Sequence, residues 1–344
     1  MHDPLTVLVS GMPWPFTVRP SLENLADPDL RHLIAVALLE LGLAALLLTI
    51  AVVVRRGKIV PVLLALPLFF MQGPSLSLLL VEATPTSFRP SPTGFSTASI
   101  AAGRAIFAKN CVACHGEAGD GVGGKGAVAD LRLPHIWGHP IGDLFWFVSH
   151  GIEGPEGTRE MPAFEQILSE GERWSAIDYV RALNAGAVAR GLDGWPQRVQ
   201  APSISLSCAS LAARAMFDLR GNVVRVILGA LPGALAGVPP VSGIKMVTVW
   251  LPGPETEAAA VPGVDCVARG GADEAAAYAI LAGSPDGHLV AARFLIDPDG
   301  VLRSVWRKDD GDNWADPERL LEEVRTICTE PLTIEPGDEY AHHH

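Results

Sequence analysis

The chain has 344 residues, 49% of them hydrophobic, and a formal net charge of −12. This length is enough for two ordinary domains. An acidic chain without a basic cluster lacks the positive surface that phosphates require, so nucleic-acid binding is excluded as its function. The positive mean hydropathy comes largely from an N-terminal region that is too apolar to belong to a soluble core.

Two apolar runs, residues 32–54 and 59–82, are each long enough to cross a bilayer as a helix. Only the basic segment Arg55–Lys58 separates them. Short basic loops stay in the cytoplasm, so both ends of this helical hairpin are expected on the opposite side. The sequence therefore predicts an inner-membrane protein with a periplasmic N-terminal tail, residues 1–31, and periplasmic soluble domains.

Residues 83–97 are rich in proline, serine and threonine. This composition is typical of an extended linker, and it predicts a tether between the membrane hairpin and the next domain.

A Cys-x-x-Cys-His motif follows at Cys111, Cys114 and His115. A pair of cysteines at this spacing serves either as a redox dithiol or as the thioether anchor of a covalent haem c. The adjacent histidine favours haem, because the two thiols then bond to the vinyl groups while the imidazole becomes the proximal iron ligand. Half of a zinc site is the weaker alternative, since a second ligand pair at similar spacing is missing.

An electron-carrying haem also needs a sixth iron ligand, which is most often methionine in cytochromes of this kind. Met161 lies in a Met-Pro turn before an apolar helix and is the first candidate. His135, His139 and His150 are the alternatives, and His150 is the one expected nearest the haem because it follows an apolar run. Bis-histidine ligation would lower the reduction potential.

At this point residues 98–190 resemble a class I monohaem cytochrome c domain, an all-α fold with one covalent haem c. The resemblance implies that Gly103 and Phe107 of the first helix pack against Tyr179 of the last one. The stretch "DLRLPHIWGHPIGDLFWFVSHGI" is more narrowly similar to cytochrome domains attached to membrane proteins of the copper-resistance D type.

Residues 191–334 alternate between strand and helix patterns. Strands are predicted at "NVVRVILG", "KMVTVWL", "VDCVA", "LVAARFLID" and "VLRSVW", and helices at "ADEAAAYAILA" and "DPERLLEEVRTI". The last cytochrome helix is expected to be followed by a linker, "NAGAVARGLDGWPQRVQAP".

This region resembles an α/β thioredoxin-like fold, but the Cys-x-x-Cys of active members is missing, which predicts a redox-inactive domain used for docking or packing. The cysteines Cys208, Cys266 and Cys328 are scattered, and a disulfide between two of them stays open. Residues 335–344 are expected to form a tail.

These features predict a multi-domain protein: a membrane-anchored periplasmic c-type cytochrome that passes single electrons to or from redox partners. It would serve as a subunit of, or partner to, a larger respiratory or photosynthetic complex rather than as a stand-alone enzyme. A copper-handling or thiol-redox maturation factor with an auxiliary cytochrome is the alternative function.

Overall fold

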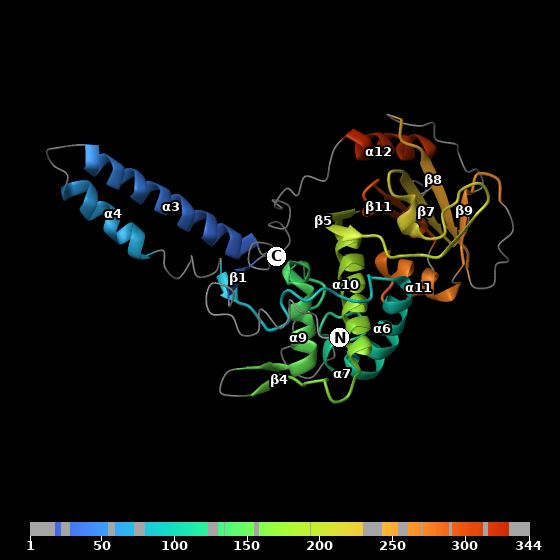
Figure 1. Cartoon of the computed structure of the whole chain (residues 1–344), viewed down its shortest axis with the longest axis horizontal. Helices are drawn as coiled ribbons and strands as arrows, with labels where there is room; N and C mark the ends of the chain where they lie inside the picture. Colours follow the sequence, from blue (N-terminus) through green and yellow to red (C-terminus); the bar gives the residue numbers. More distant parts are fainter. Residues whose placement is uncertain are drawn as a thin grey trace. The chain divides into compact units, whose positions relative to one another are not determined.

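The structure is a computed structural model of the whole chain (Figure 1). It describes residues 18–21, 28–53, 59–71, 80–122, 130–133, 135–154, 158–192, 194–229, 243–253, 261–269, 271–288, 291–311 and 316–329. The chain divides into two compact units: residues 1–90, 134–146 and 336–344, and residues 91–133 and 147–335. Each unit is considered by itself.

The first unit contains the apolar helices α3 (Pro28–Val53) and α4 (Ile59–Met71), which lie side by side (Figure 1). Within the described residues only α3, over His32–Val53, is long and apolar enough to cross a membrane. Its outward-facing side chains include Leu39, 75% exposed, and Val52, 85% exposed. Apolar surface of this kind is stable in lipid rather than in water.

The predicted second span differs from the structure. The helix α4 has 13 residues, and residues 72–79 lie outside the described part of the chain. The end of the predicted span is not helical, because Leu80–Glu82 forms strand β2, which pairs antiparallel with β1 (Val18–Pro20). A pairing partner from before α3 thus overrides the apolar pattern of this segment. Among the described residues one candidate membrane helix is found, and the second span stays a prediction.

The first unit also contains the short helix α8 (His135–Gly138) and the beginning of α9 (Ile141–His150). The helix α9 is continuous, and its last residues belong to the second unit. The predicted tether, residues 83–97, is not extended throughout, since residues 84–89 are hydrogen-bonded to the first turn of α9.

The helical part of the second unit is built on α6 (Thr97–Asn110), α7 (Val112–His115) and α10 (Glu170–Leu192). Ser96 caps α6, because its hydroxyl accepts the backbone N–H of Ser99 at 3.2 Å. A small antiparallel ribbon, β3 (Ile152–Glu153) and β4 (Arg159–Met161), stands between α9 and α10 in the chain.

The helix α10 runs further than the sequence analysis expected. Residues 184–192 continue the helix instead of starting a linker, and Gly194–Gln200 forms strand β5. Ala185 and Ala189 have fully buried side chains in this extension. Alanine has a high helix propensity and fits a close helix contact, so the segment gains more from packing than from remaining extended.

The rest of the second unit is a seven-stranded mixed sheet in the order β5-β11-β10-β7-β8-β9-β6. Its other strands are β6 (Leu206–Cys208), β7 (Val223–Leu228), β8 (Met246–Leu251), β9 (Cys266–Ala268), β10 (Ala292–Ile296) and β11 (Val301–Arg307). The strands β7, β8 and β9 are parallel. The strand β10 is antiparallel to β7, and β11 is antiparallel to β10.

Two helices accompany this sheet, α11 (Ala272–Leu281) and α12 (Pro317–Thr329). In α11, Tyr278 packs edge-on against Phe294 of β10, with ring centroids 5.1 Å apart. In α12, Leu320 and Val324 form a buried cluster with Val223, Leu295 and Trp306 of the strands. Because Phe294 and Leu295 are adjacent in β10 and point to opposite faces, the two helices cover opposite faces of the sheet.

The helical part and the sheet are packed together through α11. Gly186 of α10 approaches it so closely that an added Cβ would lie 2.0 Å from the carbonyl oxygen of Ile280. The Tyr179 hydroxyl donates to the Pro285 carbonyl at 2.9 Å, and the Trp195 indole donates to Ala185 at 2.8 Å. The sheet is therefore continuous with the helical core and shares an interface with it.

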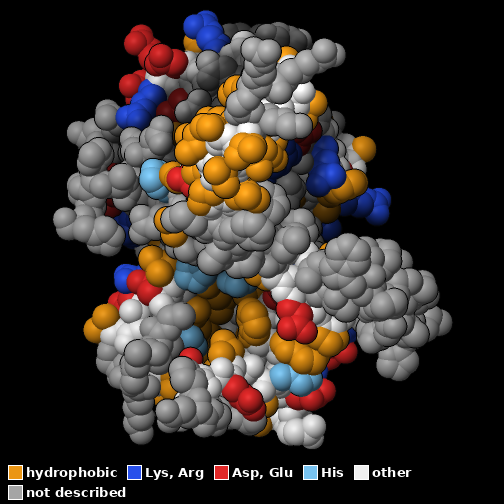
Figure 2. All heavy atoms as spheres, turned by 90° about the vertical axis from the view of Figure 1, so that its left-hand side faces the viewer, with side chains coloured by type: hydrophobic (Ala, Val, Ile, Leu, Met, Phe, Trp, Pro, Cys, Tyr) orange, Lys and Arg blue, Asp and Glu red, His pale blue; other side chains and the backbone are white. Residues whose placement is uncertain are grey.

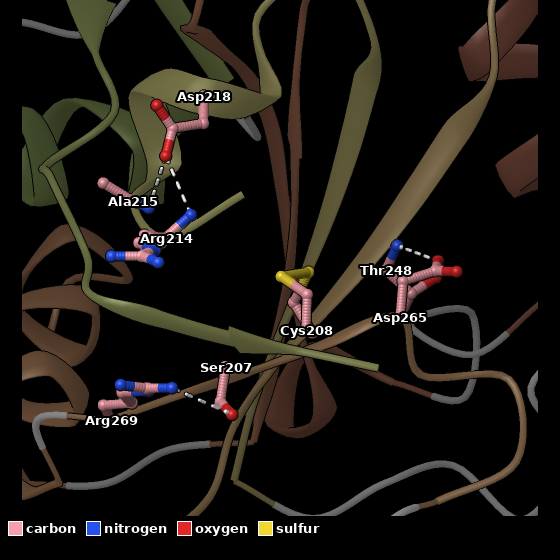
Figure 3. The surroundings of a disulfide bond; sticks show 9 residues. Ser207, Cys208, Arg214, Ala215, Asp218, Thr248, Asp265 and Arg269 are labelled. Atoms are coloured by element: carbon pink, nitrogen blue, oxygen red, sulfur yellow. Dashed lines mark hydrogen bonds between the residues drawn. A yellow bond between two sulfur atoms is a disulfide. The ribbon is translucent and has the colours of Figure 1, made fainter. Parts of the chain in front are cut away.

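A disulfide joins Cys208 of β6 to Cys266 of β9 (Figure 3). The two residues are direct partners in the antiparallel register, which brings their side chains to the same face of the sheet. Cys328 is a free thiol. The sequence left open whether two of these three cysteines form a disulfide, and the structure pairs Cys208 with Cys266.

Candidate haem centre

The Cys-x-x-Cys-His motif forms one helical turn. The backbone N–H of Cys111 still donates to Phe107 of α6, at 2.8 Å, and the N–H of His115 donates to the carbonyl of Cys111 at 2.9 Å. Residues three apart on a helix share a face, so Cys111 and Cys114 present their thiols together. Both are half-buried free thiols. A short helix thus positions two thiols and an imidazole within a single turn.

The electrostatic surroundings disfavour thiolate chemistry at this pair. Burial, together with the neighbouring Cys114, raises the pKa of the Cys111 thiol to about 11. A redox dithiol reacts through a thiolate, which is promoted by a lowered pKa. The environment of Cys111 is the opposite of the one that activates such a pair.

The helix crossing beside the motif involves the three residues that the sequence analysis singled out. A Cβ on Gly103 would lie 1.9 Å from the backbone oxygen of Ser175, so α6 and α10 are in backbone contact at this glycine. The Phe107 ring lies between His115 and Tyr179, with ring centroids 6.3 and 5.1 Å away, respectively. This crossing fixes the end of α6 from which the motif starts.

The glycine-rich loop after the motif folds back onto it. Gly116 has a φ of +74°, which glycine adopts without strain, and the N–H of Gly121 donates to the carbonyl of His115 at 2.9 Å. The N–H of Leu131 donates to Gly119 at 2.8 Å. Residues 123–129 lie outside the described residues.

Asn184 of α10 holds the end of this loop. Its side-chain amide, which is fully buried, donates to the carbonyls of Leu131 and Leu133, each at 2.8 Å. The sequence analysis missed this residue. A polar residue in the middle of the apolar face of α10 was the available signal, because a buried amide needs partners.

Met161 is the last residue of β4 and is half-buried. It pairs with Ile152 of β3. The preceding residue, Gly151, approaches it so closely that a Cβ added there would lie 2.3 Å from the carbonyl oxygen of Met161. The N–H groups of Phe164 and Glu165 donate back to Val148 and Ser149 of α9, each at 3.1 Å. The Met161 segment is thus attached to the last turn of α9.

The alternative sixth ligands lie in different surroundings. His150 ends α9 and is 41% exposed, with its Nε2 3.9 Å from a carboxylate oxygen of Glu165. His135 begins α8 and His139 directly follows it, with ring centroids 5.8 Å apart, and both belong to the first unit. Of the four candidates, Met161 and His150 belong to the same unit as His115.

These residues fit a covalently attached haem. Two free thiols and a histidine in one turn would suit the two thioether anchors and one iron ligand, and a thioether or an imidazole would suit the other. Hydrophobic side chains gather in the upper half of the face shown in Figure 2, and histidine side chains are visible below them.

The helical turn, the helix crossing and the donor set together define a cytochrome c domain that binds haem c covalently. This class agrees with the comparison to known families: residues 98–180 match the family model of "Cytochrome C oxidase, cbb3-type, subunit III". The cytochrome c domain and its haem c are therefore confirmed. The family model that matches is that of this oxidase subunit, and the narrower likeness to the copper-resistance D type stays a prediction.

Individual relatives carry names of the same family. A "Cbb3-type cytochrome c oxidase subunit CcoP" from Azospirillum sp. (strain B510) is 34% identical over 128 residues, which are 33% of this chain and 43% of the relative. A "Cbb3-type cytochrome c oxidase subunit FixP" from Azorhizobium caulinodans is 36% identical over 92 residues, 25% of this chain and 30% of the relative. The CcoP of Azospirillum brasilense is 32% identical over 94 residues, 25% of this chain and 31% of the relative. The chain thus spans less than half the length of these relatives.

Proposed function

We propose that this chain is a membrane-anchored c-type cytochrome that transfers single electrons as a subunit of a cbb3-type oxidase or a closely related membrane complex. The observation that carries the proposal is the Cys111–His115 turn within a segment that matches the subunit III family. The candidate membrane helix α3 supports the anchoring. Electron transfer, rather than a reaction of its own, is the activity we assign to the chain.

We assign the site residues as follows. Cys111 and Cys114 form the two thioether bonds, His115 is the proximal ligand and Met161 is the distal ligand, with His150 as the alternative. When bound, the haem supplies a one-electron Fe(III)/Fe(II) couple whose potential depends on its ligands, burial and hydrogen bonds. The chain's own residues hold the two axial positions, and the buried crossing at Gly103, Phe107 and Tyr179 keeps water from that side.

We place the soluble domains and both termini on the periplasmic side of the inner membrane. The basic loop Arg55–Lys58 supports this orientation, since short loops rich in lysine and arginine stay in the cytoplasm. The disulfide between Cys208 and Cys266 is independent support, because disulfides persist in oxidising compartments.

We interpret residues 194–329 as a thioredoxin-like domain without thiol chemistry. Two observations support this interpretation: the order β8-β7-β10-β11, with β7 and β8 parallel and the next two strands antiparallel, and the helices α11 and α12 on opposite faces. The cysteines of the disulfide are 58 residues apart, unlike those of a Cys-x-x-Cys centre. Its role is then packing against α10 and docking.

The alternative function, copper handling or thiol-redox maturation, receives no support from the comparisons. Among the described residues no group of three or more histidine, cysteine, aspartate or glutamate side chains is placed to hold a metal ion. We therefore do not propose it.

The first experiment is an absorption spectrum of the full chain, purified in detergent with its haem, with and without the Met161→Ala substitution. We expect reduced haem c bands in both proteins. A weak near-infrared sulfur-to-iron band should be present in the parent and missing from the variant. The same band in Met161→Ala, or its absence from the parent, would contradict methionine ligation.

The second experiment tests the host complex. A tag on this chain should recover oxidase subunits with a stoichiometric haem-copper spectrum from solubilised membranes of its own cells. A Cys111→Ala, Cys114→Ala variant should be inserted without covalent haem and lose electron transfer to the oxidase. Recovery of this chain without any oxidase would contradict the subunit proposal.

A further inference from the structure

A buried carboxylate at the first turn of α9 gathers three segments of the chain. Asp143 has a side chain that is 1% exposed. It accepts hydrogen bonds from the hydroxyl of Thr84, at 2.9 Å, from the hydroxyl of Ser87, and from the guanidinium of Arg19. We call Arg19, Thr84, Ser87 and Asp143 the Asp143 joint. Its segments come from before α3, from after α4 and from α9.

Neighbouring contacts hold the same segments together. The Thr86 hydroxyl donates to the carbonyl of Gly142 at 2.6 Å, and a Cβ on Gly142 would lie 1.7 Å from the backbone oxygen of Thr86. The Arg89 guanidinium lies over the Phe145 ring, 5.1 Å from its centroid. The chain that enters and leaves the apolar hairpin is thus fastened to α9 at residues 84–89, within the segment predicted as an extended linker.

The other end of α9 holds the segment that carries Met161. Val148 and Ser149 accept the N–H groups of Phe164 and Glu165, each at 3.1 Å, and the guanidinium of Arg173 donates to the Ser149 hydroxyl. The helix is ten residues long and contains no proline or glycine beyond its first turn. A short helix with intact hydrogen bonds moves as one piece, so a shift of its first turn displaces its last turn.

We propose that Asp143 is a positioning residue for the distal haem ligand: by fixing the first turn of α9, the Asp143 joint holds the Met161 segment in place. The inference rests on the proposed function in that Met161 is taken as the distal ligand. Hydrogen bonds to a buried charged group are stronger than those between neutral groups, so losing them destabilises the contact. When the joint loses its carboxylate, the first turn of α9 loses the charged acceptor that gathers Arg19, Thr84 and Ser87. The helix then gains access to other positions, and the segment that carries Met161 is held less firmly.

The test uses the full, haem-loaded chain in detergent and the substitution Asp143→Asn, which keeps the shape of the side chain and removes its charge. Ser87→Ala removes one donor only and serves as a milder variant should Asp143→Asn fail to fold. The matched control is Asp299→Asn, because the side chain of Asp299 is 76% exposed and has one surface partner, Arg198. Three quantities are measured: the near-infrared sulfur-to-iron band, the rate of carbon monoxide binding to the reduced protein, and amide exchange of Phe164 and Glu165.

We expect Asp143→Asn to weaken the near-infrared band, and to raise carbon monoxide binding and exchange at the two amides by about tenfold. Ser87→Ala should change them in the same direction and less, and the control should leave all three unchanged. A folded Asp143→Asn protein with the band, carbon monoxide rate and amide exchange of the parent would overturn the inference. If the parent itself lacks the band, the assignment of Met161 fails, and the exchange of the two amides still decides whether the joint positions this segment.

Discussion

The haem segment and the sheet differ in how closely their local sequence is tied to their role. In the haem segment five consecutive residues, Cys111–His115, make one helical turn that has a single chemical use, and the family comparison agrees with it. In the sheet no short motif has that specificity, and its character emerges from strand order and direction. A covalent cofactor demands particular residues at fixed spacing, whereas a packed sheet accepts many sequences that are hydrophobic and fit together.

The sheet also has a covalent link, the Cys208–Cys266 disulfide, and its removal should lower the stability of the protein more than any other change considered below. Reducing or deleting the Cys208–Cys266 disulfide opens a loop of 58 residues, and chain entropy then destabilises the domain by about 4 kcal/mol. We expect a reductant to lower the midpoint of thermal unfolding of the parent, measured by circular dichroism.

The double variant Cys208→Ala, Cys266→Ala is the matched control. It should unfold at the lower temperature with or without reductant, although Cys328 is still present. A midpoint that a reductant lowers equally in both proteins would contradict the assignment of the effect to this disulfide.

The helix crossing of the haem segment should be almost as sensitive. Gly103→Ala places a methyl group 1.9 Å from the backbone oxygen of Ser175, so α6 and α10 must separate. We expect a loss of about 3 kcal/mol of stability, with a change in the haem spectrum. Chemical unfolding followed by haem absorbance measures it.

Gly171→Ala is the control for this crossing, because Gly171 lies in α10, the other helix of the crossing, and its added Cβ would meet nothing within 4 Å. It should be neutral or slightly stabilising. If Gly103→Ala behaves like Gly171→Ala, the close crossing is not a requirement of the fold.

The contact between the haem segment and the sheet, at α10 and α11, can be tested separately. Gly186→Ala brings a methyl group 2.0 Å from the carbonyl oxygen of Ile280, and it should cost about 2 kcal/mol. We expect unfolding of the haem region and of the sheet, followed by haem absorbance and by circular dichroism, to coincide in the parent and to separate in the variant.

Gly191→Ala, where an added Cβ meets nothing within 4 Å, is the control and should leave the two transitions coincident. Transitions that are already separate in the parent would show that the regions are independent.

The smallest predicted effect is a pH dependence that belongs to the sheet. Burial raises the pKa of Glu323 in α12 to about 7, against the lowering influence of Arg293 and Arg319. Between the ordinary pKa of a glutamate and about 7, the folded protein holds a proton that the unfolded chain has released. Stability therefore falls as the pH rises through this range, by about 1 kcal/mol after allowance for the partial exposure of the side chain.

Glu323→Gln should remove this part of the pH dependence in urea unfolding at pH 5 and pH 8, and Glu322→Gln, at the exposed neighbouring position, should keep it. A stability that changes between these pH values by the same amount in all three proteins would show that Glu323 is not the titrating group.

Much of the architecture follows from short-range patterns. The strands β7, β8, β9, β10 and β11 and the helices α11 and α12 coincide with predicted segments, because alternation and apolar runs report burial directly. The edge strands β5 and β6 were missed, since β5 lacks a continuous apolar run and β6 has only three residues. The end of α10 was taken for a linker, because its alanines and glycines give little hydrophobic signal until α11 is packed against them.

The sequence by itself determined the chemistry of this protein: a covalent haem needs two thiols and a histidine in one turn, and those residues are adjacent in the chain. It also determined the apolar helix, because the length of a membrane span is a property of one segment. Only the tertiary structure decided which cysteines pair, where the tether ends and what Asp143 holds. Each of these depends on residues tens of positions apart, Cys208 with Cys266 and Arg19 with Asp143, and such contacts are fixed by the packing of the whole chain rather than by any local pattern.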